Sequence, residues 1–150
     1  SGKLVKINDD GFHIQTGDNV NVYTVDTGKT SNFFIGEYVR LNSLDGKMYN
    51  VALDDGYDYN LLIKGSIFDE ASKISVRVKE ILRDESGRMK IHGVAADNRE
   101  YHIIADADTI TNFSHSKLKA DDDVLIYPSN VTSDIPALVN AKAIVMKNRS

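Results

Sequence analysis

Apolar and polar residues alternate with a period of two along most of the chain, which is typical of β-strands that bury one face. In the first third of the sequence this alternation predicts five short strands, at residues 3–7, 12–14, 20–25, 37–41 and 48–53. Turn sequences that contain glycine separate them, as in Asp9-Asp10-Gly11 and Asp54-Asp55-Gly56. Because glycine tolerates the positive φ of tight hairpins, we expect a small barrel or sandwich in this part.

The second half of the chain repeats this plan. Strands are predicted at residues 74–82, 89–94, 98–105, 124–127 and 138–146. Between the halves, residues 59–63 are predicted to form a further strand and residues 69–73 a short polar link. This segment has no tract rich in Gly, Ser or Pro, so we expect the halves to be packed or stiffly joined. The predicted division is a first barrel over 1–56, a connection over 57–73 and a second barrel over 74–150.

The two halves can be aligned with each other at a nearly constant spacing. His13 matches His92, and Asp18-Asn19 matches Asp97-Asn98. Further matches follow in the same order: Tyr23 with Tyr101, Val25 with Ile103, Phe33 with Phe113, and Val39 with Val124. The composition that β proteins share produces some such pairs by chance, but here the spacing changes only at loops, where insertions are tolerated. We therefore predict an all-β protein of two tandem five-stranded barrels related by internal duplication.

The second half also carries a recognisable order of turn and core sequences. An acidic loop with threonine, Asp106-Ala107-Asp108-Thr109, leads to residues 118–124, and the chain closes on Ala141-Lys142-Ala143-Ile144. This order resembles small bacterial extracytoplasmic OB-like β-barrel modules of uncharacterised function, in which a Leu-x-x-Gly-Asp-x-Val turn precedes the fourth strand. The first half keeps the glycine as Gly36, whereas Asp121 stands at that place in the second half and predicts a less tight turn. The resemblance implies the fold and a location in the cell envelope, and no activity.

Composition narrows the classes of function. The 150 residues include 22 acidic and 18 basic side chains, a formal charge of −4, and no cysteine. The absence of cysteine excludes disulfide scaffolds, cysteine zinc sites and thiol enzymes. The acidic balance disfavours a dedicated nucleic-acid binder, and no apolar run is long enough to predict a membrane span. Ser1-Gly2 fits the remnant of a cleaved tag, so this end carries no information about a signal peptide.

The chain has no sequence signature of catalysis or of cofactor binding. Gly-x-Ser-x-Gly, Gly-x-Gly-x-x-Gly and Walker A motifs are all missing. The segment that starts at Asp106 begins like a calcium loop, but Ile110, Thr111 and Lys117 stand where an EF-hand needs a ligand, a glycine and a glutamate. We therefore predict neither an enzyme nor a bound cofactor.

Two histidines and two aspartates are the best candidates for a metal site. His92 and His102 lie on strands that we expect to pair, so their rings can approach each other across the sheet. With Asp106 or Asp108 they would supply the imidazole and carboxylate groups that bind zinc. The alternative is that both histidines are ordinary strand residues that face solvent.

Basic residues concentrate along one predicted hairpin, over residues 73–90. The candidate binding residues are Arg77, Lys79, Arg88 and Lys90, of which the first two share one face of a strand. Such a hairpin on an acidic protein can meet a phosphate or an anionic cell-wall polymer. The alternative is an ordinary charged outer face of a β-sheet.

A phenylalanine recurs in the connection before the fourth strand of each half. Phe33 and Phe113 each follow an asparagine there. A loop has little reason to carry an aromatic ring twice unless the ring enters an apolar space, so we predict that both rings close one end of a barrel. The alternative is that both rings are exposed and contact a partner.

These features favour a non-enzymatic interaction or structural module, secreted or in the bacterial cell envelope, whose partner is a protein or an anionic cell-wall polymer. The second interpretation is an OB-type binder of single-stranded nucleic acid, with Phe12, Tyr23 and Tyr101 available to stack on bases. Tyr23 and Tyr101 share faces with Val25 and Ile103, however, and this pattern indicates core positions. A small-ligand or metal-binding domain is the third interpretation.

Overall fold

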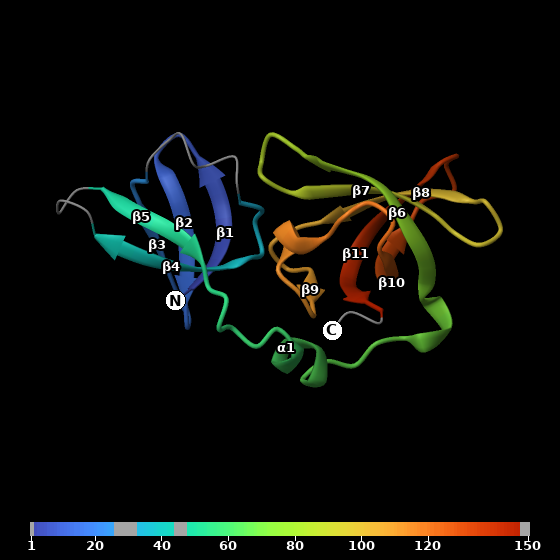
Figure 1. Ribbon diagram of the computed structural model, residues 1–150, viewed down its shortest axis with the longest axis horizontal. Coiled ribbons are helices and arrows are strands. Elements are labelled where there is room, and N and C mark those ends of the chain that lie inside the picture. The colour runs from blue at the N-terminus through green and yellow to red at the C-terminus, as the bar shows by residue number, and fades with distance from the viewer. Residues whose placement is uncertain (1, 26–32, 44–47, 148–150) are drawn as a thin grey trace.

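A computed structural model describes residues 2–25, 33–43 and 48–147 of the chain, and the described part is built from β-strands and a few short helical turns (Figure 1). The first half contains β1 (Gly2–Asn8), β2 (Gly11–Thr16), β3 (Asn19–Tyr23), β4 (Tyr38–Ser43) and β5 (Tyr49–Leu53). The connection contains helix α1 (Asn60–Lys64) and the 3₁₀ turn η2 (Glu70–Ser72). The second half contains β6 (Ile74–Arg83), β7 (Met89–Val94), β8 (Glu100–Ala105), β9 (Ile110–Thr111), the 3₁₀ turn η3 (His115–Lys117), β10 (Asp123–Val131) and β11 (Ala137–Met146). Within the described ranges, no helix has the length and apolar character needed to cross a membrane.

The second half forms a closed five-stranded barrel. The strands follow the order β10-β6-β7-β8-β11, and β11 pairs again with β10 to complete the ring. All pairings in the ring are antiparallel except β8 with β11, which is parallel, and β9 adds a short parallel pairing at the far end of β11. Apolar side chains on the inner face fill the barrel, among them Val78, Met89, Ile91, Ile126 and Ile144.

The first half forms a five-stranded sheet in the order β3-β2-β1-β4-β5. It curls around its own core, which includes Leu4, Phe12, Ile14 and Val39. Its two end strands approach each other at a single parallel bridge, between Val25 and Tyr49, in the described ranges. The prediction of two closed barrels is therefore correct for the second half, whereas the first half is a curled sheet that is closed at one point.

The two halves agree in strand order and in the position of a β-bulge. β1 and β6 each pair with the following strand on one side and with the fourth major strand on the other. In both, the register with the next strand shifts one residue after the second buried position, between Leu4 and Lys6 and between Val78 and Glu80. This register places His13 and His92 at the same point of their sheets, as the sequence alignment expects.

The turn before the fourth strand is also the same in both halves. Gly36 and Asp121 both have positive φ, 99° and 75°. The backbone N–H of Gly36 donates to the carbonyl of Leu4 at 2.6 Å, and that of Asp121 donates to the carbonyl of Val78 at 2.8 Å. The expectation that Asp121 loosens the turn is wrong, because aspartate tolerates the left-handed region better than most residues.

The register changes three of the matches that the sequence suggested: Phe33 with Phe113, Tyr23 with Tyr101, and Val25 with Ile103, since Ile103 takes the place of Tyr23. Counted from the shared turn, Phe33 corresponds to Leu118 rather than to Phe113, and both of these side chains are buried. Tyr23 lies opposite Phe12, whereas Tyr101 lies opposite Gly93, two positions away from the equivalent place. A longer turn between β7 and β8 than between β2 and β3 accounts for the shift of Tyr101.

The connection between the halves contains a helix where we expected a strand. Residues 60–64 form α1, whose first turn is capped because the Asp58 carboxylate accepts a hydrogen bond from the N–H of Asn60 at 3.1 Å. A short apolar run is compatible with either a helix or a strand, so the pattern alone did not decide between them. The ring of Phe68 stacks on Tyr127 of β10 with centroids 4.7 Å apart, and this contact ties the connection to the second barrel.

The surroundings of Phe33 and Phe113 predict unequal losses of stability on truncation to alanine. Phe33 is buried in the first core with its ring edge-to-face against Phe12 at 5.6 Å, whereas Phe113 is only partly buried against the second core. Phe33→Ala is expected to cost about 3–5 kcal/mol through lost burial and a cavity, and Phe113→Ala about 1–2 kcal/mol. Urea denaturation of both variants measures the difference. An unchanged midpoint for Phe113→Ala would contradict its role in the core and favour an exposed contact residue.

Candidate functional site

The four candidate cations of the hairpin do not form one patch. Arg77 lies 3.1 Å from a carboxylate oxygen of Asp123, and Arg88 lies 2.7 Å from one of Asp84, so two of the four charges are compensated. Arg77 faces Val94 across the β6–β7 pairing, while Lys90 faces Leu82, five positions further along β6. At about 3.3 Å per residue this separates Arg77 from Lys90 by roughly 16 Å, and Arg88 lies further along the same hairpin. The binding role of the four residues stays a prediction.

The expected approach of the two histidines is correct. His92 and His102 are direct partners across β7 and β8, with ring centroids 5.2 Å apart, and His92 Nε2 lies 2.9 Å from a carboxylate oxygen of Glu100. The aspartates are engaged elsewhere, because an Asp106 oxygen accepts a hydrogen bond from the N–H of Asp108 at 2.9 Å and shapes the turn after β8. In residues 2–25, 33–43 and 48–147 no three His, Asp or Glu side chains lie together in a way that would hold a metal ion. The structure thus brings His92 and His102 together, whereas Asp106 and Asp108 form no metal-binding group with them in the described residues.

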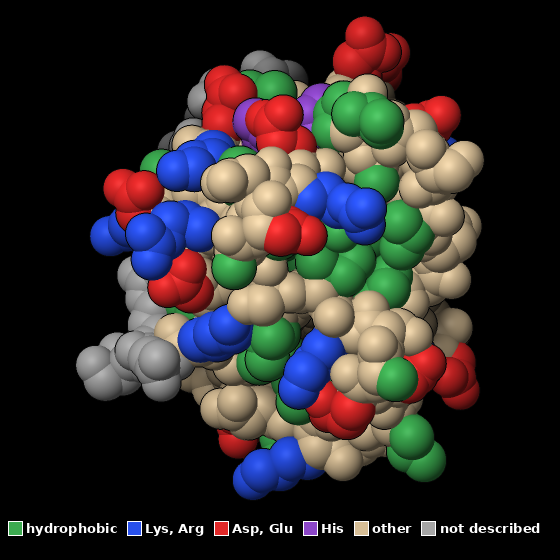
Figure 2. Space-filling model, turned by 90° about the vertical axis from the view of Figure 1, so that its right-hand side faces the viewer, with side chains coloured by type: hydrophobic (Ala, Val, Ile, Leu, Met, Phe, Trp, Pro, Cys, Tyr) green, Lys and Arg blue, Asp and Glu red, His purple; other side chains and the backbone are tan. Residues whose placement is uncertain are grey.

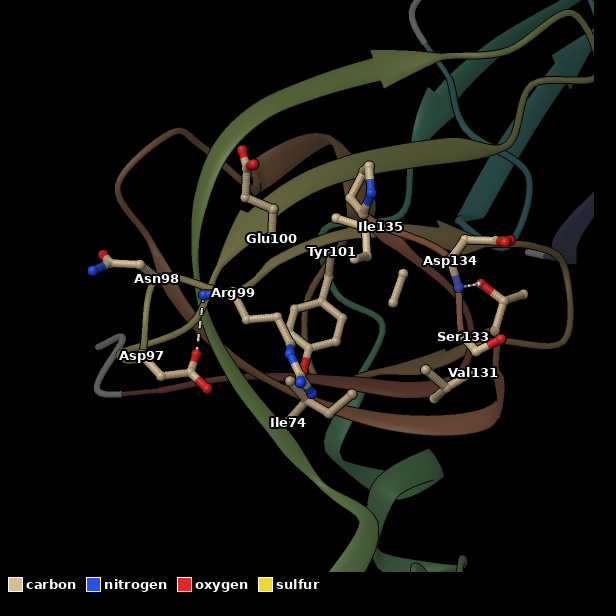
Figure 3. A pocket seen from close by; sticks show the side chains of 13 residues that line it. Ile74, Asp97, Asn98, Arg99, Glu100, Tyr101, Val131, Ser133, Asp134 and Ile135 are labelled. Atoms are coloured by element: carbon tan, nitrogen blue, oxygen red, sulfur yellow. Dashed lines mark hydrogen bonds between the residues drawn. The ribbon is translucent and has the colours of Figure 1, made fainter.

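A hollow on the described surface lies at one end of the second barrel. It has a volume of about 580 Å³ and is enclosed by the β7–β8 turn, the β10–β11 loop and the first residue of β6. Figure 3 shows Tyr101 between the side chains of the turn and those of the loop. The apolar part of the lining consists of Ile74, Tyr101, Val131, Ile135, Pro136 and Ala137. We call this hollow the end pocket.

The two walls of the end pocket are fixed by local hydrogen bonds. In the turn, the Asp97 carboxylate accepts from the N–H of Arg99 at 3.0 Å, and a hydrogen bond between the Arg99 and Tyr101 side chains raises the pKa of Arg99. In the loop, the Thr132 hydroxyl oxygen accepts from the N–H of Leu138 at 2.9 Å, which closes the base of the loop. The tip is thereby held out from the barrel, and the side chain of Ile135 is 99% exposed.

The charge around the end pocket is negative. Three carboxylates, of Asp97, Glu100 and Asp134, and one guanidinium, of Arg99, belong to its lining, a formal charge of −2. Figure 2 shows the side of the molecule that carries the β7–β8 turn and the β10–β11 loop, where hydrophobic side chains gather among charged ones. The pocket thus combines an exposed apolar surface with an acidic rim.

A polar cluster lies where the two halves meet, around the buried side chain of Glu37. Glu37 is completely buried, and its carboxylate accepts hydrogen bonds from the hydroxyl of Ser114, from the N–H of Ser116 at 3.0 Å and from the Ser116 hydroxyl at 2.7 Å. Its other oxygen accepts from the N–H of Phe34 at 2.7 Å. The carboxylate of the first half is therefore held by η3 and the residue before it in the second half.

His115, between these two serines, is buried, and neither ring nitrogen has a hydrogen-bond partner within the described residues. Gly36 lies directly against the ring, since a Cβ atom at that position would be 2.9 Å from His115 Cε1. Two further hydrogen bonds join the halves nearby: the N–H of Ile35 donates to the carbonyl of Gly87 at 2.8 Å, and Arg83 Nε donates to the carbonyl of Phe33 at 2.9 Å. We call this region, from Phe33 to Glu37 together with Ser114–Ser116, the junction.

Sequence reasoning missed both the end pocket and the junction. For the pocket, the available signal was an isolated isoleucine in the polar connection over residues 132–136. For the junction, it was the Ser-His-Ser sequence at residues 114–116. Neither signal says which distant residue it will face, because the pairing depends on how the halves dock.

Comparison with known proteins gives no relative for this chain: no family model, no curated protein and no solved structure matches it. Its function is therefore argued from the site alone.

Burial of His115 predicts a specific pH dependence of stability. Desolvation lowers the pKa of His115 to about 4, partly opposed by the negative charges of Glu37 and Asp106 and reinforced by Lys3. The ring titrates near 6.5 in an unfolded chain. Between these pH values the unfolded chain binds a proton on this ring that the folded chain does not. The contribution of His115 to the free energy of unfolding is therefore fully present above pH 6.5, and it falls by roughly 3 kcal/mol as the pH drops to about 4.

Replacing the ring with an apolar side chain removes this contribution. We expect the difference between wild type and His115→Leu in free energy of unfolding to change with pH between 6.5 and 4, in favour of the variant at low pH. Chemical denaturation at a series of pH values measures it. Leu82→Ala is the control and should keep the wild-type slope, because Leu82 is exposed and carries no titratable group. If the free energy of unfolding of wild type and of His115→Leu changed with pH in the same way, the lowered pKa of His115 would be contradicted.

Proposed function

We propose that this protein is a non-enzymatic interaction module, made of two OB-like units related by duplication, which holds a segment of a partner protein in the end pocket. The common origin of the units is supported by their shared strand order, by the equivalent bulges after Leu4 and Val78, and by the matching turns at Gly36 and Asp121. Five strands in which the first pairs with the second and the fourth, and the third lies parallel to the fifth, form the arrangement of an OB barrel.

The observation that carries the binding proposal is the exposed apolar surface of the end pocket. Ile135 is 99% exposed and Val131 46% exposed, and both line the end pocket together with Tyr101. Scattered apolar residues on a surface need no explanation, but a concave group of them with a polar rim is typical of a binding site. A buried apolar anchor inside a polar rim is also the usual organisation of a protein interface.

The negative charge around the end pocket favours some classes of partner over others. A formal charge of −2 around the pocket repels phosphates and anionic cell-wall polymers and attracts a basic group. The chemistry that fits is a peptide segment with an aliphatic or aromatic side chain next to lysine or arginine. A protein partner is therefore favoured over the anionic polymer, whose counterpart would be the scattered cations of the β6–β7 hairpin.

The buried polar groups support a structural rather than a catalytic interpretation. The carboxylate of Glu37 is fully occupied by hydrogen bonds, and His115 is completely enclosed, so a substrate has no access to either. General acid–base catalysis needs a group within hydrogen-bond reach of the substrate. The extracytoplasmic location remains part of the proposal and is supported by the resemblance described above.

Selection of peptides from a random display library on the immobilised protein tests the proposal. We expect enriched sequences to pair an apolar residue with a basic one. Ile135→Asp should abolish their binding, because it places a carboxylate in the apolar surface and adds to the acidic rim. Leu82→Asp is the matched control, because Leu82 is exposed near the end of β6 and does not line the end pocket. This variant should bind like wild type.

Two outcomes would contradict this assignment: no enrichment over a blank surface, or enriched peptides whose binding is the same to wild type and to Ile135→Asp.

The nucleic-acid alternative makes a different prediction. Binding to phosphates depends on several clustered cations and on counterion release. With Arg77 and Arg88 paired to carboxylates, a labelled single-stranded oligonucleotide of about 20 nucleotides should show no sub-micromolar binding at roughly 150 mM salt. Fluorescence anisotropy measures this directly. Tight binding under these conditions would replace the peptide proposal with the nucleic-acid one.

A further inference from the structure

The two halves differ in the strand pairing along the outer edge of their third strand. In the second half this strand is β8, and β11 covers its edge through four consecutive partners, from Tyr101 with Ala137 to Ile104 with Asn140. In the first half the third strand is β3, which pairs with β2 on one side. On its other side, β5 reaches this strand at Tyr49, whose ring packs edge-to-face against that of Tyr23 at 5.0 Å and whose backbone contacts Thr24 and Val25, just beyond the end of β3. Among the described residues, the backbone edge of Asn19–Tyr23 has no strand partner, whereas its counterpart is paired with β11.

This edge has none of the features that usually prevent strand addition. Natural proteins protect edge strands with lysine, proline, bulges or very short length. The sequence of β3 is Asn-Val-Asn-Val-Tyr, without a charge or a proline, and its register with β2 is regular from Phe12–Tyr23 to Thr16–Asn19. Its first four residues are all exposed, Val20 to 52% and Val22 to 49%. Unpaired backbone groups on such a strand are a template for another strand.

We propose that β3 pairs antiparallel with β3 of a second copy of this chain, about a two-fold axis at Asn21. In that register Val20 faces the partner's Val22, and Val22 faces the partner's Val20, on the outer face of the joined sheet. Asn21 faces its own counterpart, and Asn19 faces the partner's Tyr23, so no like charges stand opposite each other. A two-fold interface requires a surface that is complementary to itself, and this strand provides one.

The chemistry of the strand favours a second copy over an unrelated extended segment. β-branched side chains directly opposite each other stabilise an antiparallel pair, and the two-fold register produces two such valine pairs at once. The five-residue edge buries less area than a standard interface of about 1,600 Å². The association is therefore weak and depends on concentration. It joins two five-stranded sheets into one sheet of ten strands and does not involve the end pocket.

A single introduced cysteine at the axis tests the register. The chain has no cysteine of its own, so Asn21→Cys provides one thiol per copy, and directly opposed residues of antiparallel strands have Cα atoms within the range of a disulfide. At about 100 µM protein under mild oxidation, in the concentration range of a weak complex, we expect rapid formation of a covalent dimer. Lys90→Cys, exposed on β7 of the other barrel, is the control. Equal rates for the two variants would overturn the proposal.

Charge variants at the valines test the pairing without a covalent bond. Val20→Lys with Val22→Lys opposes like charges at both cross-strand pairs and is expected to weaken dimerisation by about tenfold or more. Val20→Lys with Val22→Glu opposes unlike charges at the same places and should restore it. Sedimentation equilibrium measures both, and circular dichroism confirms the fold. A monomeric wild-type protein at millimolar concentration, or equal association of the two double variants, would overturn the proposal.

Discussion

The arrangement of the molecule depends on one buried anion, the carboxylate of Glu37. Removing a carboxylate from water costs several kcal/mol unless hydrogen bonds replace its hydration. Here the donors come from both halves of the chain: Phe34 supplies one from the same turn, and Ser114 and Ser116 supply the others from the second barrel. A docking that moved the serines away while Glu37 stayed buried would leave its carboxylate without these hydrogen bonds. This requirement fixes how the two units dock and which faces they leave to solvent.

The same position of the fold serves different purposes in the two halves. Asp122 is the counterpart of Glu37 and caps its own turn through the N–H of Lys119 at 2.9 Å, but it does so at the surface. The longer side chain of glutamate caps the turn and also reaches the neighbouring unit. Gly36 contributes by lacking a side chain, because any Cβ there would collide with His115. A turn that is local in one half has thus become the contact between halves in the other.

Much of the fold was predictable from the sequence, and the reasons are local. Alternation of buried and exposed positions gave all five strands of the first sheet and the five barrel strands of the second, within a few residues. The prediction of a strand at residues 59–63 was wrong, because so short an apolar run shows neither the period of a helix nor that of a strand clearly. The shift of Tyr101 depends on the length of a turn, which composition does not reveal. The end pocket and the junction depend on residues that are distant in sequence, such as Tyr101 with Ile135 and Glu37 with Ser114. Periodicity contains no information about such pairs.

Across the junction, each hydrophobic core is packed against a side chain from the other half of the chain. Phe34, from the first half, packs against the core of the second barrel, and Ala107, from the second half, packs against the core of the first sheet. Neither core is therefore complete within its own stretch of chain. A fragment cut after residue 56 would expose the face on which Ala107 sits and would carry Phe34 with nothing to cover it. The packing of each half is consequently completed by a side chain from the other half.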